Sequence, residues 1–119
     1  ILEEDAKKIM KVIKNHSNQY MTISFDVKKN FINKIPAAVH PFDKTCRPQV
    51  VSKKLNFDYY NLIKEFKKIT KVGALLNTSF NLHGEPIVFE PKNAVKSFLN
   101  SGLEYLYIGN YLVTKISKK

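Results

Sequence analysis

A dense cluster of small polar side chains follows an apolar run in the sequence, within a stretch from 72 to 91 that holds no lysine or arginine. Asn77, Ser79 and Asn81 alternate along this cluster, so an extended chain would place them on one side. Two amides and a hydroxyl both donate and accept hydrogen bonds, which suits phosphate oxygens or a carbamoyl-like amide. The alternative interpretation is turn chemistry alone, for which the same residue types are typical.

A second cluster combines an imidazole, a carboxylate, a hydroxyl, a guanidinium and an amide within ten residues. Its members are His40, Asp43, Thr45, Arg47 and Gln49. Arg47 is the only arginine among twenty basic residues. A guanidinium holds phosphate through two parallel hydrogen bonds, which an ammonium cannot do. This loop is therefore a candidate phosphate site, and the alternative is a surface ion pair between Arg47 and Asp43, which would contribute little.

Other reactive residue types indicate no further site. His16, His40 and His83 lack the close spacing of zinc ligands, so we expect no metal in this chain. The single cysteine, Cys46, excludes an intrachain disulfide and fits a reducing compartment, so we expect a cytoplasmic protein. Ser79 lacks the glycine-flanked turn of hydrolases, and the four glycines are too scattered for a nucleotide-binding loop.

Length and composition indicate a globular domain. The chain has 119 residues, of which 44% are hydrophobic and 25% charged. No apolar run approaches the roughly 18 residues that cross a bilayer, so we expect no membrane contact. The net charge of +10 could indicate a nucleic-acid-binding module, but it comes almost entirely from lysines on the outer faces of predicted helices. We therefore expect no nucleic-acid partner.

Hydrophobic periodicity predicts three helices, at 3–14, 58–71 and 91–100, the last capped by Gly102. Strand patterns are found at 20–27, 35–40, 49–52, 72–76, 87–89, 103–108 and 111–114. The run 72–76 is continuously apolar, as in a strand that is covered on both faces. The alternation of helices and strands predicts an α/β (α+β) fold with a single twisted mixed sheet and packed helices. Ligands of such sheets bind beyond the carboxyl ends of strands, where the first polar cluster lies.

Taken together, the two clusters resemble the signatures of the O-carbamoyltransferase family, which includes nodulation and antibiotic-tailoring carbamoyltransferases. The run 75–88, Leu-Leu-Asn-Thr-Ser-Phe-Asn-Leu-His-Gly-Glu-Pro-Ile-Val, is similar to that family's signature nearly residue for residue. The segment from His40 to Gln49 resembles its His-x-Asp-Gly-Thr-x-Arg-x-Gln loop. Two features differ: an extra residue stands between His40 and Asp43, and Lys44 stands where the family usually has glycine. The resemblance extends from residue 1 to about residue 115.

The resemblance implies part of a YrdC-like C-terminal domain that binds carbamoyl phosphate and ATP with Mg²⁺ and forms carbamoyl-adenylate with loss of pyrophosphate. It implies that Arg47 and Asn81 are catalytic, with Arg47 on phosphate or carbamoyl oxygens and Ser79 and Asn81 on nucleotide phosphates. Further binding residues would be His40, Asp43, Thr45, Gln49, Asn77, His83, Gly84 and Glu85. For Glu85 the alternative is a structural brace of the turn.

The resemblance also implies a separate N-terminal Kae1-like domain, which would hold a metal and pass the carbamoyl group to an acceptor hydroxyl. That family carries a Lys/Arg-rich stretch just upstream of a start like that of this chain. We therefore expect residues 1–119 to be a fragment that has little activity alone and that could self-associate through an exposed apolar patch. A basic nucleic-acid-binding module and a non-catalytic interaction domain with the same fold are the alternatives.

Overall fold

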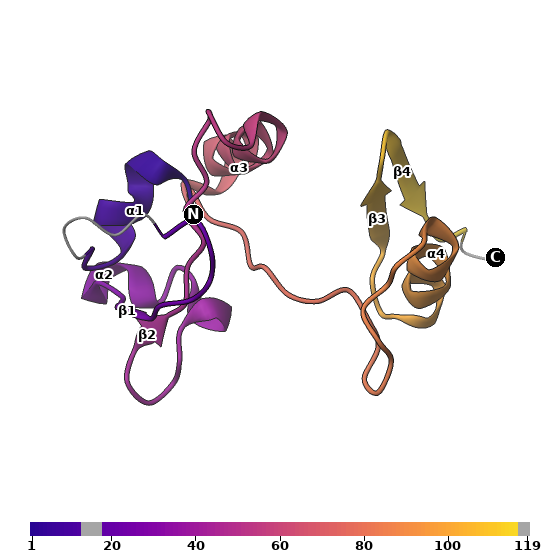
Figure 1. Ribbon diagram of the computed structural model, residues 1–119, viewed down its shortest axis with the longest axis horizontal. Coiled ribbons are helices and arrows are strands. Elements are labelled where there is room, and N and C mark those ends of the chain that lie inside the picture. Colours follow the sequence, from indigo (N-terminus) through magenta and orange to yellow (C-terminus); the bar gives the residue numbers. More distant parts are fainter. Residues whose placement is uncertain (13–17, 117–119) are drawn as a thin grey trace. The chain divides into compact units, whose positions relative to one another are not determined.

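A computed structural model describes residues 1–12 and 18–116, and the chain divides into two compact units, Ile1–Leu76 and Asn77–Lys119 (Figure 1). Each unit is described by itself. The first contains α1 (Glu3–Ile9), β1 (Phe25–Asp26), α2 (Lys29–Ile32), the 3-10 helix η1 (Pro36–Ala38), β2 (Thr45–Cys46) and α3 (Phe57–Thr70). The second contains α4 (Pro91–Asn100), β3 (Tyr105–Ile108) and β4 (Tyr111–Thr114). The predicted α/β class is confirmed.

Two small antiparallel sheets take the place of the single mixed sheet, and that part of the prediction was wrong. In the first unit β1 pairs with β2, with Phe25 opposite Cys46 and Asp26 opposite Thr45. In the second unit β3 pairs with β4 from Tyr105–Thr114 to Ile108–Tyr111. The one parallel pairing among the described residues is an isolated bridge between Leu2 and Val51.

Two apolar clusters form the core of the first unit. One consists of Leu2, Val51 and Ile63, which joins the start of the chain to α3. The other consists of Ala6 and Met10 with Phe25, which joins α1 to β1. Because Leu2 directly precedes α1 and Ala6 lies within it, the N-terminal segment links the small sheet to the long helix.

α1 ends at Ile9, five residues before the predicted boundary at 14. Met10 is extended, with φ −133° and ψ 165°, and it forms an antiparallel bridge with Val27. The N–H of Lys11 then donates to the carbonyl of Asp26 at 2.9 Å. The chain leaves the helix because these strand contacts satisfy its backbone, which helical periodicity alone does not reveal. Residues 13 and 14 of the predicted helix and His16 lie outside the described residues.

Three strands predicted in the first unit are either shorter than predicted or replaced by another element. The strand at 20–27 reduces to β1, and the one at 49–52 reduces to the bridge at Val51. The segment 35–40 contains the 3-10 helix η1 instead of a strand, and Pro36 is the first residue of this helix. Proline fixes φ near −65° and has no N–H for a strand ladder, which favours this helical turn.

The apolar run 72–76 forms no strand, so its prediction as a buried strand was wrong. Gly73 is buried and its carbonyl accepts from the N–H of Leu2 at 2.9 Å, but Leu76 is 59% exposed. Residues 87–89 form no strand either, although the N–H of Val88 donates to the carbonyl of Phe80 at 3.0 Å. A short apolar run is thus compatible with a segment that packs by a few residues only.

The helix predicted at 58–71 is confirmed as α3, with boundaries one residue earlier. The side chain of Asn56 accepts from the N–H of Tyr59 at 3.1 Å and caps the helix start. Lys71 ends the helix in the left-handed region with φ 64°. Ile63 faces the core, whereas Ile69 is exposed.

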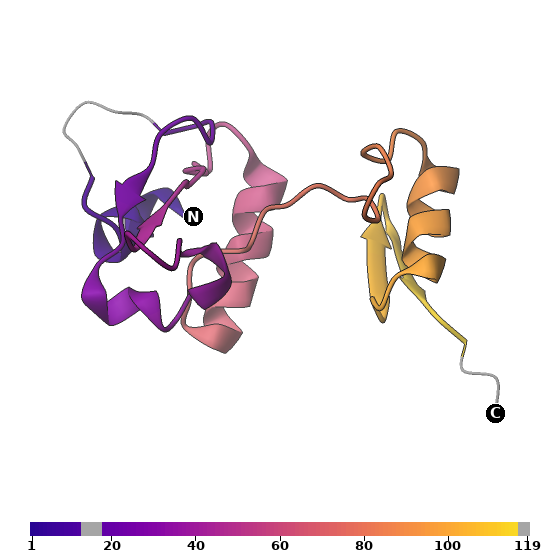
Figure 2. The same cartoon turned by 90° about the horizontal axis from the view of Figure 1, so that it is seen from below.

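In the second unit α4 lies along the β3–β4 hairpin (Figure 2). The predicted helix at 91–100 is confirmed, with Pro91 at its first turn. Ala94 and Phe98 are buried, whereas Leu99 is exposed. The helix ends at Ser101 in an extended conformation, so the predicted Gly102 cap was wrong. Both C-terminal strands are confirmed, and the turn between them contains Gly109 at φ 57°.

A buried carboxylate connects α1, α3 and the segment that follows α3. Asp5 is 4% exposed, and its Oδ2 lies 2.6 Å from the Nζ of Lys67. Lys8 reaches the other oxygen at 3.2 Å. Burial alone would raise the pKa of Asp5, but the two ammonium groups outweigh it and hold the pKa below its ordinary value. A Cβ on Gly73 would lie 2.0 Å from Asp5 Oδ2, so only glycine fits beside the pair.

We predict that Gly73→Ala lowers the free energy of unfolding by about 2–3 kcal/mol, because its methyl group would displace the Asp5 carboxylate. Urea unfolding monitored by circular dichroism measures the change. Gly102→Ala is the matched control, since nothing lies within 4 Å of a Cβ there. Equal stabilities of the two variants would contradict this packing.

We also predict that Asp5→Asn lowers the free energy of unfolding by about 2 kcal/mol at pH 7, because it leaves Lys67 without its buried partner. The pKa of Asp5 is depressed in the folded state, so its contribution is present above the ordinary carboxyl pKa and is lost as the pH falls through the folded value. The difference between wild type and variant should therefore shrink in acid. Asp26→Asn is the control, because its pair with Lys11 is exposed and should contribute under about 0.5 kcal/mol.

Candidate functional site

The loop between His40 and Thr45 is closed by its own backbone. The N–H of His40 donates to the carbonyl of Thr45 at 2.8 Å, and the N–H of Lys44 donates to the carbonyl of His40 at 3.1 Å. β2 starts at Thr45 and pairs with β1, which ties the loop to the core. The extra residue in this loop therefore does not prevent a closed turn, and it leaves Phe42 at the tip, 90% exposed.

Asp43 organises the side chains of this loop. Its Oδ1 accepts from the N–H of Thr45 at 2.9 Å and from the hydroxyl of Thr45 at 2.8 Å. The Nδ1 of His40 lies 3.2 Å from the same oxygen. The hydrogen bonds from Thr45, backbone first, and the nearby His40 lower the pKa of Asp43 below its ordinary value. Three of the predicted site residues are thus brought together.

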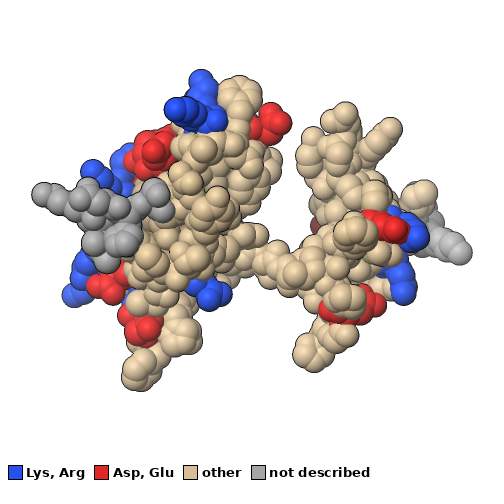
Figure 3. Space-filling model, viewed as in Figure 1, with Lys and Arg blue, Asp and Glu red and all other residues tan. Residues whose placement is uncertain are grey.

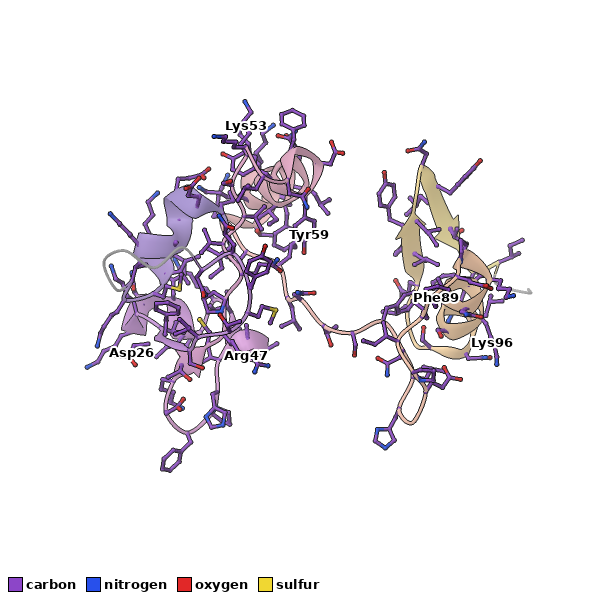
Figure 4. All side chains as sticks on the ribbon, viewed as in Figure 1. Asp26, Arg47, Lys53, Tyr59, Phe89 and Lys96 are labelled. Atoms are coloured by element: carbon purple, nitrogen blue, oxygen red, sulfur yellow. The ribbon has the colours of Figure 1, made fainter. Side chains whose placement is uncertain are left out.

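Thr45, Arg47 and Gln49 share one side of the segment that follows the loop. Burial alternates along this segment, since Cys46 and Pro48 are buried while Thr45, Arg47 and Gln49 are more exposed. An extended chain with this alternation places every second side chain on the same side. Figure 4 labels Arg47 on this segment. The spacing Thr-x-Arg-x-Gln therefore gives one polar surface next to the Asp43 network.

Arg47 forms no ion pair with any residue that the structure describes. Asp43 pairs with His40 instead, so the expected alternative of an Arg47–Asp43 pair was wrong. An exposed guanidinium that has no ion-pair partner within the described part of the chain is available to an anion. Arg47 can therefore bind a phosphate or a carboxylate.

Cys46 has a structural role in β2. It is 7% exposed, and burial raises the pKa of its thiol. The thiolate is the reactive form of cysteine, so a raised pKa opposes nucleophilic chemistry.

The first polar cluster, which contains Asn77, Ser79 and Asn81, forms a turn in the second unit. The Nδ2 of Asn81 donates to the carbonyl of Glu85 at 2.8 Å, and the N–H of Glu85 donates to the carbonyl of Leu82 at 3.0 Å. Gly84 has φ 82°, a conformation that favours glycine. Asn81 and Glu85 thus brace the turn, which is the structural role that we weighed for this sequence. The Oδ1 of Asn81 is not engaged by these bonds.

The remaining polar residues of the turn are accessible. Asn77, Ser79 and His83 are exposed, while Glu85 is half-buried. A ligand can therefore reach a hydroxyl, an amide and an imidazole on this segment. Arg47 belongs to the first unit and these residues to the second, so the structure gives the geometry of each cluster separately. Whether all of them bind one ligand stays a prediction.

The backbone conformation of Lys44 is a feature that residue types alone do not reveal. Its φ is 58°, in the left-handed region that favours glycine. The family loop carries glycine at the matching position, and that difference was the available signal. The backbone here thus has the shape that a glycine would adopt, and the ammonium of Lys44 bonds to the carbonyl of Pro41.

Charged residues of both signs lie on the surface of the protein. Figure 3 shows lysine and arginine side chains on the visible face interspersed with acidic and uncharged ones. No three His, Cys, Asp or Glu residues within 1–12 and 18–116 gather as a possible metal site. In the same ranges no helix has the length and apolar character to cross a membrane.

Comparison with known proteins assigns the chain to a family. The family model described as "Carbamoyltransferase C-terminus" matches residues 1–115. The chain belongs to this family. The resemblance inferred from the two motifs is therefore confirmed, while the YrdC-like fold itself stays a prediction.

Several longer proteins contain a similar segment. An uncharacterized protein of Methanocaldococcus jannaschii is 42% identical over 115 residues, which cover 97% of this chain and 18% of that protein. Nodulation protein NolNO of Sinorhizobium fredii is 38% identical over 116 residues, 97% of this chain and 17% of that protein. Nodulation protein NolO of Bradyrhizobium diazoefficiens is 37% identical over 115 residues, 96% of this chain and 21% of that protein. The chain thus spans about a fifth of the length of these relatives.

We predict that Lys44→Gly raises the free energy of unfolding by about 0.5–1 kcal/mol, because glycine adopts φ 58° without steric cost. Urea unfolding measures the change. Lys64→Gly in α3 is the control, because glycine inside a helix should lower stability by about 1 kcal/mol. A loss of stability in both variants would contradict the strain assigned to Lys44.

Proposed function

We propose that this carbamoyltransferase C-terminal domain binds carbamoyl phosphate and ATP and takes part in forming carbamoyl-adenylate. Carbamoyl phosphate, ATP and water would give carbamoyl-adenylate, pyrophosphate and phosphate. The carbamoyl group would then pass to an acceptor hydroxyl in an N-terminal metal-containing domain of the complete enzyme. Membership of the family and the chemistry of the two polar clusters support this function.

The observation that carries the proposal is the exposed guanidinium of Arg47, which has no ion-pair partner in residues 1–12 and 18–116 and follows Thr45 on one side of its segment. Carbamoyl phosphate and ATP bring several negative oxygens together, and positioning and charge neutralisation are the main requirements of such a reaction. Arg47 would hold phosphate oxygens through parallel hydrogen bonds. The hydroxyl of Thr45 is already directed at Asp43, so Thr45 would keep the loop in shape rather than bind the ligand.

Uncharged residues would serve the nucleotide. Ser79 and Asn77 are exposed, and they would donate hydrogen bonds to nucleotide phosphates without adding fixed charge. Asn81 would contribute its carbonyl oxygen and the shape of the turn, because its amide N–H is held by Glu85. His83 and Gly84 would form the floor of the nucleotide site. Mg²⁺ would arrive bound to ATP, since its preferred ligands are phosphate oxygens and water.

We predict that Arg47→Ala in the intact enzyme lowers pyrophosphate release from ATP and carbamoyl phosphate by about 100-fold or more, because one charge-neutralising donor contributes that much to such a step. Arg47→Lys should recover only a small part, since an ammonium cannot form the bidentate contact. Isotope exchange between pyrophosphate and ATP measures the same step independently.

Lys64→Ala is the matched control, because Lys64 is an exposed cation on α3. Its activity should equal that of the wild type. Full activity of Arg47→Ala, with unchanged Michaelis constants for both substrates, would exclude the proposed role of this loop.

A further inference from the structure

The proposed reaction contains a step that needs a base. Carbamoyl-adenylate has one oxygen between its carbamoyl carbon and the α-phosphorus, and in carbamoyl phosphate that oxygen still carries its own phosphate. The phosphate must therefore leave, with water as the co-reactant, before the resulting carbamate can attack ATP. Water is a weak nucleophile at neutral pH, so a positioned base accelerates its attack by about 10²–10⁴-fold.

We propose that His40, oriented by Asp43, is the general base that activates this water; the inference rests on the proposed function. The oxygen of water forms a bond to the carbamoyl carbon, and the bond from that carbon to the phosphate oxygen breaks. The Nε2 of His40 takes one proton from water and later releases it to solvent. The remaining acid proton goes to the departing phosphate, so the products are carbamate and hydrogen phosphate.

The geometry of the loop supports this assignment. The Nδ1 of His40 lies 3.2 Å from Asp43 Oδ1, within reach of a hydrogen bond. When Nδ1–H donates to that carboxylate, Nε2 has a free lone pair and can accept a proton. Asp43 is itself fixed by two hydrogen bonds from Thr45, at 2.9 and 2.8 Å. A base that is oriented by a third group is the arrangement that proton transfer requires.

The surroundings of His40 suit a base that meets water and an anion. Its side chain is 60% exposed, so water reaches it. Its backbone N–H and C=O are both bonded within the loop, which limits its movement. Asp43 contacts the side chain of Thr45, and Thr45 shares its side of the segment with Arg47. Arg47 would hold the phosphate, which stabilises it as the leaving group.

Attack at carbon, not at phosphorus, follows from these roles. Transfer of a phosphoryl group passes through a loose transition state that gains little from a base. Addition of water to a carbonyl carbon does need proton removal, and a guanidinium on the phosphate favours its departure. The pairing of one base with one anion-binding residue therefore fits cleavage of the carbon–oxygen bond.

The first experiment separates phosphate release from the reaction with ATP in the intact enzyme. Pyrophosphate release is measured with carbamoyl phosphate, and again with ammonium bicarbonate, whose solutions contain carbamate. His40→Asn keeps a donor for Asp43, and it should lower the first rate by about 100-fold or more while leaving the second within about 3-fold. Arg47→Ala is the comparison that should lower at least the first rate. An equal loss in both assays for His40→Asn, or no loss, would overturn the role of His40.

The outcomes also distinguish this inference from the proposed function. A wild-type enzyme that releases no pyrophosphate from either substrate would refute the proposed function and this step with it. In water labelled with ¹⁸O, label should enter carbamate and not phosphate; label in phosphate would overturn attack at carbon.

A second experiment needs no activity and uses the 119-residue chain. Long-range ¹H–¹⁵N spectra report which nitrogen of neutral His40 carries the proton. Pairing with Asp43 predicts the Nδ1–H form, whereas the Nε2–H form would contradict a base at Nε2. Asp43→Ala should reduce the Nδ1–H population, which a merely structural role of Asp43 in closing the turn would not require.

Discussion

A carboxylate buried at the junction of α1, α3 and Gly73 is the constraint on which the first unit depends. Burying Asp5 is unfavourable unless cations stay beside it, and Lys67 and Lys8 supply them. The same carboxylate occupies the space that any side chain at Gly73 would need. One ion pair thus fixes where the long helix lies against the first helix and where the chain runs after it. The loop with Arg47 is connected to this frame through β1 and β2.

A second carboxylate has a different role at the surface. Asp43 is exposed, and it accepts two hydrogen bonds from Thr45 and pairs with His40. These contacts set the shape of the loop and the orientation of the imidazole. The guanidinium of Arg47 has no ion-pair partner among the described residues, whereas Asp43 pairs with His40. Arg47 is the one arginine in a chain whose other basic residues are lysines, and its binding of an anion stays a prediction.

The sequence predicted some features well because they depend on local chemistry. α3 and α4 have strong periodicity with an Asn cap or a proline start, and the β3–β4 hairpin has alternating residues around Gly109. The predicted strand at 72–76 failed because an apolar run does not say whether a partner strand is present. The end of α1 failed because Met10 bridges to Val27, seventeen positions along the chain.

Sequence by itself determined the family and the residues of both polar clusters. Residue identity and short spacing determine these features, because both act locally. Tertiary structure decided that Asp43 holds His40 and not Arg47, that Asn81 braces its own turn, and that Gly73 must be glycine. Each of these depends on which groups meet in space, and competition among several possible partners is settled only when the chain is packed.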